Sequence, residues 1–365
     1  MASMKSTYAT TTGTKEWKTR ASKLLEHVSV ANAVGLEIGA LHLPLVRKQE
    51  GQIFYADYKR RDDLVKHYSQ DPSFPLDDIV DVDFVLSGRA LPEVIAQTMA
   101  FDYVLASHVI EHCPDVLGWL LQIASVLRPG GVLALAIPDK RFTFDYFRRV
   151  STLGDIVDAY LNRLTRPSPK QIVDHCHYAA FIDAGTIWSG SYDESTFVRH
   201  YTDQDGYERA LRSLRDGEYV EVHSYTFTPG SFLEIIKSLF MLGLLPFRVK
   251  GFHPTWQGSN EFVVTLERIP DELPDAERKQ LQLASVPAYT DYPSETFLFL
   301  KHGEAERLKE ENERLTSALV ATQNALALRT TQMEQVLRSH SWKVTRPARW
   351  VAQLLRCVKK SPRIT

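Results

Sequence analysis

The sequence is short of the features that define secreted and membrane-spanning proteins. Its 365 residues include only three cysteines, Cys113, Cys176 and Cys357, and none of them forms a Cys-x-x-Cys pair. This pattern excludes a disulfide framework and fits a reducing compartment. No apolar run approaches the roughly 20 residues that cross a bilayer. The Ser-, Thr- and Lys-rich start of the chain lacks the apolar core of a signal peptide, so we expect a cytoplasmic protein.

The sequence also lacks a net charge large enough to attract nucleic acid. The formal net charge is −2, and 44% of the residues are hydrophobic, which is enough to build a core. The charge is uneven, because residues 341–365 contain seven basic residues and no acidic one, leaving 36 basic and 45 acidic residues elsewhere. We therefore predict no nucleic-acid partner, and we expect attraction to an anionic surface only at the C-terminus.

Short apolar runs alternate with helical stretches along the first part of the chain. The runs that predict strands are 35–38, 53–56, 79–85, 103–106 and 132–137. Strand alternating with helix indicates a doubly wound α/β domain with a parallel sheet. A capped apolar helix from Thr228 to Leu242 and two further runs, 247–252 and 261–266, would add a closing hairpin. The predicted fold is therefore a Rossmann-like α/β domain with a seven-stranded sheet.

The remaining segments predict appendages on this domain. The alternation is lost at about 140–227, which indicates an insertion that would cap the site. A heptad-like seam of Leu308, Asn312, Leu315, Leu319, Leu326, Met333 and Val336 predicts a short coiled coil and a homo-oligomer; the alternative is one amphipathic helix folded back on the domain. The predicted division is a lead-in and helix at 1–30, the main domain at 31–268, a linker at 269–303, the coiled coil at 304–338 and a basic amphipathic tail at 339–365.

Four segments of the main domain resemble the successive motifs of class I S-adenosylmethionine-dependent methyltransferases. They are Val34–Gly39, Ile53–Asp57, Phe101–His112 and Leu127–Leu133, in the family's order. The resemblance implies a methyltransferase that uses S-adenosylmethionine. This cofactor has no pyrophosphate, so it needs one close backbone approach, at Gly39, and not the three-glycine loop of dinucleotide sites. Leu41 and Leu43 stand where the family usually has glycine.

The resemblance also assigns cofactor contacts. Glu37 would lie near the methionine amine, and Asp57, at the end of the second strand, would accept the ribose hydroxyls. Ser87 or a backbone amide would contact the adenine, because the family's usual acidic residue is missing there. Ser107 and His108 follow the fourth strand at the carboxyl edge of the sheet. The alternatives are a solvated carboxylate for Asp57, helix capping for Ser107 and packing for His108.

Methyl transfer is an in-line displacement from a sulfonium, and a hydroxyl acceptor usually needs a base as well. Asp139 follows the fifth strand, and His223 precedes the returning helix. His175 and His177 would point the same way in an extended chain, and His175 is the preferred base, tuned near neutrality. The alternative for each histidine is ordinary hydrogen-bonded structure. The His175-Cys176-His177 cluster lacks a second pair of ligands, so no metal site is predicted.

Two further features bear on the acceptor. The insertion is rich in aromatic residues interspersed with polar ones, which suits a glycan or another polar small molecule; the alternative is that these aromatics form the insertion's own core. The segment 339–350 resembles a motif of bacterial surface-polysaccharide assembly proteins, and the basic amphipathic tail predicts peripheral contact with the inner face of the membrane. We therefore expect O-methylation of a surface-polysaccharide sugar or its lipid-linked precursor. A small-metabolite methyltransferase and a non-catalytic scaffold are the alternatives.

Overall fold

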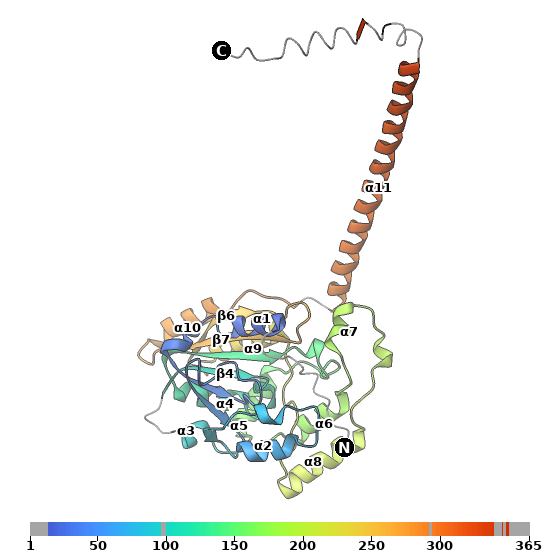
Figure 1. Cartoon of the computed structure of the whole chain (residues 1–365). Coiled ribbons are helices and arrows are strands. Elements are labelled where there is room, and N and C mark those ends of the chain that lie inside the picture. Colours follow the sequence, from blue (N-terminus) through green and yellow to red (C-terminus); the bar gives the residue numbers. More distant parts are fainter. Residues whose placement is uncertain (1–13, 96–99, 292–293, 339–344, 346–347, 350–365) are drawn as a thin grey trace, which may run out of the picture. The chain divides into compact units, whose positions relative to one another are not determined.

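A computed structural model describes residues 14–95, 100–291, 294–338, 345 and 348–349, and the chain divides into two units between Tyr292 and Pro293. The first unit is built on one seven-stranded sheet with the order β3-β2-β1-β4-β5-β7-β6 (Figure 1). Only β7 is antiparallel to its neighbours. The strands are β1 (Val34–Ile38), β2 (Gln52–Asp57), β3 (Phe84–Val85), β4 (Phe101–Ser107), β5 (Leu127–Pro138), β6 (Phe247–His253) and β7 (Glu261–Arg268). The predicted Rossmann-like sheet with a closing hairpin is confirmed.

The third strand is shorter than the predicted run of 79–85. Strand β3 pairs with β2 only through Phe84 and Val85. One residue earlier, the backbone amide of Asp83 donates to the Tyr55 carbonyl, while its carboxylate accepts the Tyr55 N–H, both at 2.9 Å. A side chain therefore replaces the backbone acceptor, and regular pairing begins only after Asp83.

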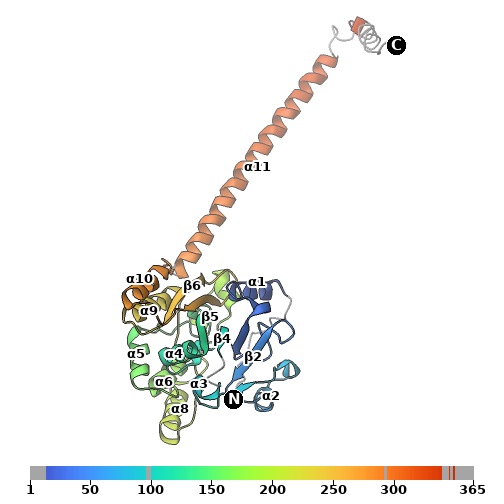
Figure 2. The same cartoon turned by 90° about the vertical axis from the view of Figure 1, so that its left-hand side faces the viewer.

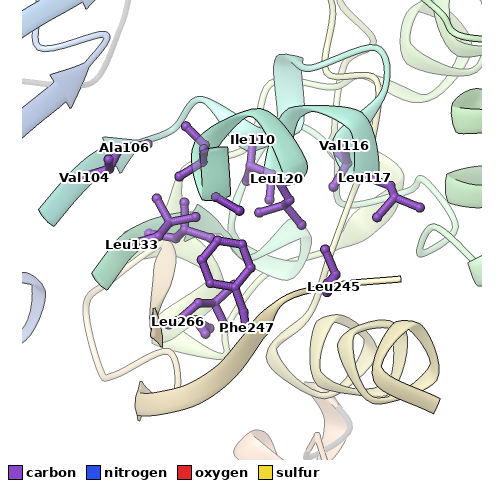
Figure 3. Packing of buried hydrophobic residues seen from close by; sticks show 14 of the residues in the cluster. Val104, Ala106, Ile110, Val116, Leu117, Leu120, Leu133, Leu245, Phe247 and Leu266 are labelled. Carbon is purple, nitrogen blue, oxygen red and sulfur yellow. The ribbon is translucent and has the colours of Figure 1, made fainter. Parts of the chain in front are cut away.

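The core lies on both faces of the sheet because successive strand residues point to opposite sides. Val104 and Ala106 belong to the larger cluster, whereas Tyr103 and Leu105 belong to the smaller one. Figure 3 shows Val104, Leu133 and Phe247 on the sheet near Leu117 and Leu120 of a covering helix. Helices α3 (Leu91–Val94), α4 (Val116–Val126) and α9 (Pro229–Met241) contribute to the larger cluster; α1 (Lys15–Leu24) and residues 40–46 contribute to the smaller.

Polar side chains begin two of the helices that cover the sheet. The Asp115 carboxylate accepts the Gly118 N–H at 2.8 Å before α4, and Thr228 caps α9 ahead of Pro229. Gly130 turns the chain after α4 with a φ of +79°, a conformation that favours glycine. Helix α2 (Arg61–Tyr68) follows β2. These caps fix where α4 and α9 begin.

The predicted insertion contains four α-helices among its described residues. They are α5 (Leu153–Leu161), α6 (Pro169–Tyr178), α7 (Ala184–Ser189) and α8 (Asp203–Asp216). Helices α6 and α8 lie side by side (Figures 1 and 2), and a Cβ on Gly206 would come within 2.9 Å of Cys176 Cβ. Ser168 caps α6 and Pro169 opens it, so residues 175–177 are helical. The extended chain expected there is wrong, and His175 and His177 point to different sides.

The segment expected to be a linker, 269–303, is largely structured. Helix α10 (Asp275–Ser285) packs on the sheet through Gln282, whose amide donates to the carbonyls of Leu245 and Phe247 at 2.6 and 2.8 Å. The sequence did not predict this helix because it has few apolar residues. A buried glutamine, Gln282, makes the contacts that anchor it.

The second unit contains α11 (Ser294–Arg338), a continuous helix that begins before the predicted start at residue 304. Its described seam residues Leu315, Leu319, Leu326 and Met333 are 59% to 66% exposed, and the coiled coil stays a prediction. Apart from residues 345, 348 and 349, the predicted tail lies outside the described residues. Among the described helices, none combines the length and apolar character needed to cross a membrane.

Candidate functional site

The loop after β1 passes against the turn that follows β4. Gly39 has a φ of +70°, and its N–H donates to the Ala56 carbonyl at 2.9 Å. A Cβ on Gly39 would lie 3.0 Å from Val109 Cγ2, and Leu41 also has a positive φ of +50°. Position 39 therefore favours glycine, both for its backbone conformation and for this close approach.

Glu37, in β1, holds the same loop through hydrogen bonds to its backbone. Its buried carboxylate accepts the Leu45 N–H at 2.9 and 3.0 Å and the Val46 N–H at 3.4 Å. Burial raises the pKa of Glu37 to about 7, although the two amides partly offset this effect. The carboxylate thus holds residues 40–46 against the sheet, and its expected contact with the methionine amine remains a prediction.

Asp57 and Ser87 lie at the ends of neighbouring strands. The Asp57 carboxylate is buried and accepts the Tyr58 N–H at 2.7 Å, and burial raises its pKa to about 6. Ser87 is exposed with a φ of +48°, and its N–H donates to the Tyr58 carbonyl at 3.2 Å. This placement allows Asp57 to face a ribose and Ser87 an adenine, and both roles stay predictions.

An ion-pair network that the sequence did not indicate holds Ser107 and His108. Glu261, the first residue of β7, accepts Arg20 Nε at 2.7 Å and bonds His108 Nε2 at 2.8 Å; Arg20 also donates to Ser107 Oγ. Burial opposes ionisation of Glu261, but the charges and hydrogen bonds of Arg20 and His108 outweigh it and lower its pKa to about 2. The sequence offers one sign of this network, because Glu261 is an acidic residue directly before the apolar run Phe262–Val264.

A second cluster surrounds Glu111, in the 3₁₀ turn Ile110–His112 directly after β4. Glu111 is 1% exposed, and neither carboxylate oxygen has a hydrogen-bond partner among the described residues. His108 Nδ1 lies 3.8 Å from Oε1 of Glu111, while His112 Nε2 and His223 Nε2 each lie 3.9 Å from it. Burial raises the pKa of Glu111 and lowers that of His112 well below its ordinary value.

His223 is oriented by groups of the insertion. Its Nδ1 bonds Asp145 Oδ2 at 2.5 Å, and Arg148 pairs with Asp145 at 2.9 Å while donating to the His223 carbonyl at 2.8 Å. Burial lowers the pKa of His223, but the Asp145 charge and hydrogen bond outweigh this effect and raise it. Asp145 therefore turns the Nε2 atom of His223 toward Glu111.

The other candidate bases have different surroundings. Asp139 is fully buried and is bound by Arg141 at 2.6 Å and by Thr255 Oγ1 at 2.7 Å. His177 is partly exposed and bonds Asp203 at 2.6 Å. His175 is buried, and burial lowers its pKa to about 3, which does not suit a base tuned near neutrality; its role as the base stays a prediction.

Many aromatic residues of the insertion pack against one another. Phe142 stacks on Trp188 with ring centroids 4.3 Å apart, and Tyr192 stacks on Phe197 at 5.7 Å. These four residues therefore pack as part of the insertion's own core, which was the alternative to their binding an acceptor. A cleft of about 550 Å³ nearby is lined mainly by polar side chains, among them Arg148, Ser151, Asp155, Lys170, Asp174 and Ser224.

Comparison with known proteins finds a protein family that matches this chain. Residues 23–212 match the family described as methyltransferase domain. No curated protein matches the chain. An S-adenosylmethionine-dependent methyltransferase from Mesorhizobium loti is 14% identical over 70% of this chain and 99% of its own, with a TM-score of 0.37.

Two further solved structures show a similar degree of likeness. The glycopeptide N-methyltransferase MtfA with sinefungin is 14% identical over 72% of this chain and 96% of its own, with a TM-score of 0.33. The CurJ carbon methyltransferase is 13% identical over 67% of this chain, with a TM-score of 0.33. This chain spans about half, 51%, of that structure's length.

Proposed function

The chain belongs to the methyltransferase domain family, whose match covers more than half of its residues, and from this premise we propose that it methylates a hydroxyl group of a sugar. It is an S-adenosylmethionine-dependent methyltransferase. Membership of this family favours an enzyme over a non-catalytic scaffold. The sugar would belong to a surface polysaccharide or its lipid-linked precursor.

The observation that carries a hydroxyl acceptor is the buried Glu111–His223–Asp145 cluster at the carboxyl edge of β4. In open α/β sheets, ligands bind at this edge. A Cβ on Gly39 would lie 3.0 Å from Val109 Cγ2 of the same turn, so the cofactor loop lies beside the cluster. A hydroxyl must lose its proton to attack, and proton-accepting groups held at this position suit that step. An amine that arrives uncharged would not need them.

The proposed reaction is a single displacement. The acceptor oxygen loses its proton and uses an electron pair to bond the methyl carbon. The bond between that carbon and the sulfonium sulfur breaks, and its electrons stay on sulfur. The products are a methyl ether, S-adenosylhomocysteine and one proton. The protein contributes alignment and exclusion of water, effects worth several kcal/mol.

A polar, extended acceptor is supported by the cleft beside the cluster. Ser224 lines this cleft, and its N–H donates to the Glu111 carbonyl at 2.7 Å. The lining residues Asp155, Lys170 and Asp174 offer hydrogen-bond partners for sugar hydroxyls. The link to surface polysaccharide comes from the sequence of residues 339–350 alone.

The test is a transfer assay with glycan from a strain that lacks this protein. With S-adenosylmethionine labelled in its methyl group, we expect label in the purified glycan, and mass spectrometry should show the added mass of one methylene per modified sugar. Label that appears only in low-molecular-weight compounds would instead support the small-metabolite alternative. Failure of the purified protein to bind millimolar cofactor in calorimetry would contradict the proposal as a whole.

We further propose that α11 joins copies of the chain and that residues 339–365 hold the enzyme at an anionic membrane surface. The exposed seam of Leu315, Leu319 and Leu326 supports self-association. Replacing these three leucines by Gln should reduce the sedimentation coefficient to that of a monomer. An unchanged coefficient would contradict the oligomer.

A further inference from the structure

We propose that Glu111, His112 and His223 bind a divalent transition-metal ion at the carboxyl edge of β4. The inference rests on the proposed function for its role, although metal binding itself is independent of the acceptor. The ligand atoms of these three residues lie within 4.8 Å of one another. They come from the turn after β4 and from the segment that returns from the insertion.

The first argument is the isolation of the Glu111 carboxylate. A buried carboxylate without hydrogen bonds is costly unless a positive charge compensates it. Both oxygens of Glu111 are buried and have no hydrogen-bond partner within the described chain. Three imidazole nitrogens face one of these oxygens at 3.8 to 3.9 Å, too far for hydrogen bonds. A cation between these groups would satisfy the carboxylate.

The distances suit a metal after a small contraction. Ligand bonds of about 2.0–2.2 Å place tetrahedral ligand atoms about 3.3–3.6 Å apart. The Glu111 Oε1 atom lies 3.9 Å from the Nε2 atoms of both His112 and His223. A closure of about half an ångström would therefore complete this part of the site. His112 is partly exposed, which leaves its ring room to move.

The second argument is the set of carboxylates behind the histidines. A metal-binding histidine usually gives its other ring nitrogen to a carboxylate, which fixes the tautomer and the ring orientation. Asp145 does this for His223 at 2.5 Å and leaves Nε2 facing Glu111. Glu261 bonds His108 in the same manner at 2.8 Å, leaving its Nδ1 3.8 Å from Glu111. His108 is therefore placed beside the site as a further donor.

The donor set indicates the kind of ion and its task. Two imidazoles and one carboxylate suit Zn²⁺ or a similar transition metal, whereas Mg²⁺ and Ca²⁺ prefer oxygen ligands. Three protein ligands leave a position for the acceptor hydroxyl. With the cation bound, Glu111 and His223 would act as ligands and not as the proton acceptors proposed above. The cation would lower the pKa of a coordinated hydroxyl, so the proton would pass to water and the oxygen would attack the methyl carbon. The sequence predicted no metal site and named His223 only as a candidate base.

The competing explanation is a network without metal, in which a protonated His223 pairs with Asp145 and Glu111. Metal titration separates the two. Full-length protein is treated with EDTA, dialysed, and titrated with Zn²⁺ in a calorimeter and with Co²⁺ in an absorption spectrometer. We expect one ion per chain and the visible absorption bands of cobalt bound to nitrogen and oxygen.

The variants locate the ion. E111Q and H223A should each weaken Zn²⁺ binding by about tenfold or more, and D145N by about tenfold through its effect on His223. H112Q is the variant to rely on if the buried substitutions impair folding, because His112 is partly exposed. H67A, at an exposed histidine on α2, is the matched control and should bind normally.

Three results would overturn the inference. No Zn²⁺ binding by the EDTA-treated protein, or binding that E111Q and H112Q leave unchanged, would overturn the metal site itself. Methyl transfer that proceeds fully after EDTA treatment would overturn the task assigned to the ion. Mg²⁺ that binds as tightly as Zn²⁺ would refute the assigned ion class. One site-specific Zn²⁺ per chain without methylation of glycan would uphold the metal site and contradict the proposed acceptor.

Discussion

Exchanging Glu261 for Gln removes the negative charge that joins α1, β4 and β7. In the folded protein this carboxylate is bonded to Arg20 and His108, and its pKa is lowered from 4.5 to about 2. That lowering corresponds to about 3 kcal/mol of stability at neutral pH, because one pKa unit is worth about 1.4 kcal/mol. We expect E261Q to lose about 2–3 kcal/mol of unfolding free energy at pH 7.

The pH dependence gives a second measure of the same contact. Because the folded-state pKa of Glu261 lies below its unfolded-state value, the stabilisation is complete above pH 4.5 and is lost as the pH falls toward 2. The wild type should therefore lose its advantage over E261Q across this interval. Urea unfolding followed by tryptophan fluorescence, repeated from about pH 7 to about pH 3, measures both proteins.

Glu267, on the same strand, provides the control. It pairs with Arg248 and Lys250, whose side chains are about one-third exposed, at 2.7 and 2.5 Å, so E267Q should cost only about 0–1 kcal/mol. The reasoning would be refuted if E261Q lost no more stability at pH 7 than E267Q. It would also be refuted if the gap between E261Q and the wild type stayed constant below pH 4.5.

The remaining predictions concern the cofactor, the sheet and the tail. If Asp57 binds the ribose as predicted, D57N should weaken S-adenosylmethionine binding by about 1.5–3 kcal/mol in calorimetry. The wild-type affinity should rise as the pH passes about 6, because the ionised carboxylate could accept both ribose hydroxyls and the protonated acid could not; a pH-independent wild type would contradict this. Gly35→Ala should lower the free energy of unfolding in urea by at least about 1–3 kcal/mol, because its Cβ would lie 2.1 Å from Tyr103 Cζ. Gly154→Ala is the control and should be tolerated, because the nearest atom to its Cβ would lie at 3.5 Å. Equal losses of unfolding free energy in the two variants would count against the packing argument. Deleting residues 339–365 should abolish flotation with anionic liposomes, and unchanged flotation would exclude the tail as the membrane contact.

The sheet was predictable because its central strands are buried on both faces. Parallel strands of this kind appear in a sequence as short continuous apolar runs, and 103–106 and 132–137 fall inside β4 and β5. Helices α4 and α9 were also predictable, since Asp115 and Thr228 cap them next to apolar stretches. Local chemistry and burial point to the same structure at these positions.

Expectations failed where a polar side chain takes over a backbone or core contact. The carboxylate of Asp83 shortens β3, and the amide of Gln282 anchors α10. In the insertion, the capping Ser168 and Pro169 make α6 helical, so the alternation of His175 and His177 carried no information about direction. Periodicity arguments count apolar residues and therefore miss elements that polar contacts hold in place.

The cofactor loop was predictable from motif spacing, whereas the groups around it were not. Gly39 lies next to the ends of β1 and β2 because it directly follows a strand. Arg20 and Glu261 meet across 241 positions of sequence, and His223 and Asp145 across 78. No local pattern reports such contacts, because they depend on how α1, the insertion and β7 assemble.

The insertion takes part in building the site. The N–H groups of Ser224 and Tyr225 donate to the Glu111 carbonyl at 2.7 and 3.2 Å, and the Tyr225 hydroxyl donates to the Pro114 carbonyl at 2.8 Å. Opening the site by moving this segment would break these bonds and withdraw His223 from Glu111. Under the proposed function, we expect the acceptor to enter along the polar cleft that Ser224 lines. Acceptor choice is then expected to depend on the residues that line this cleft, and not on a moving lid.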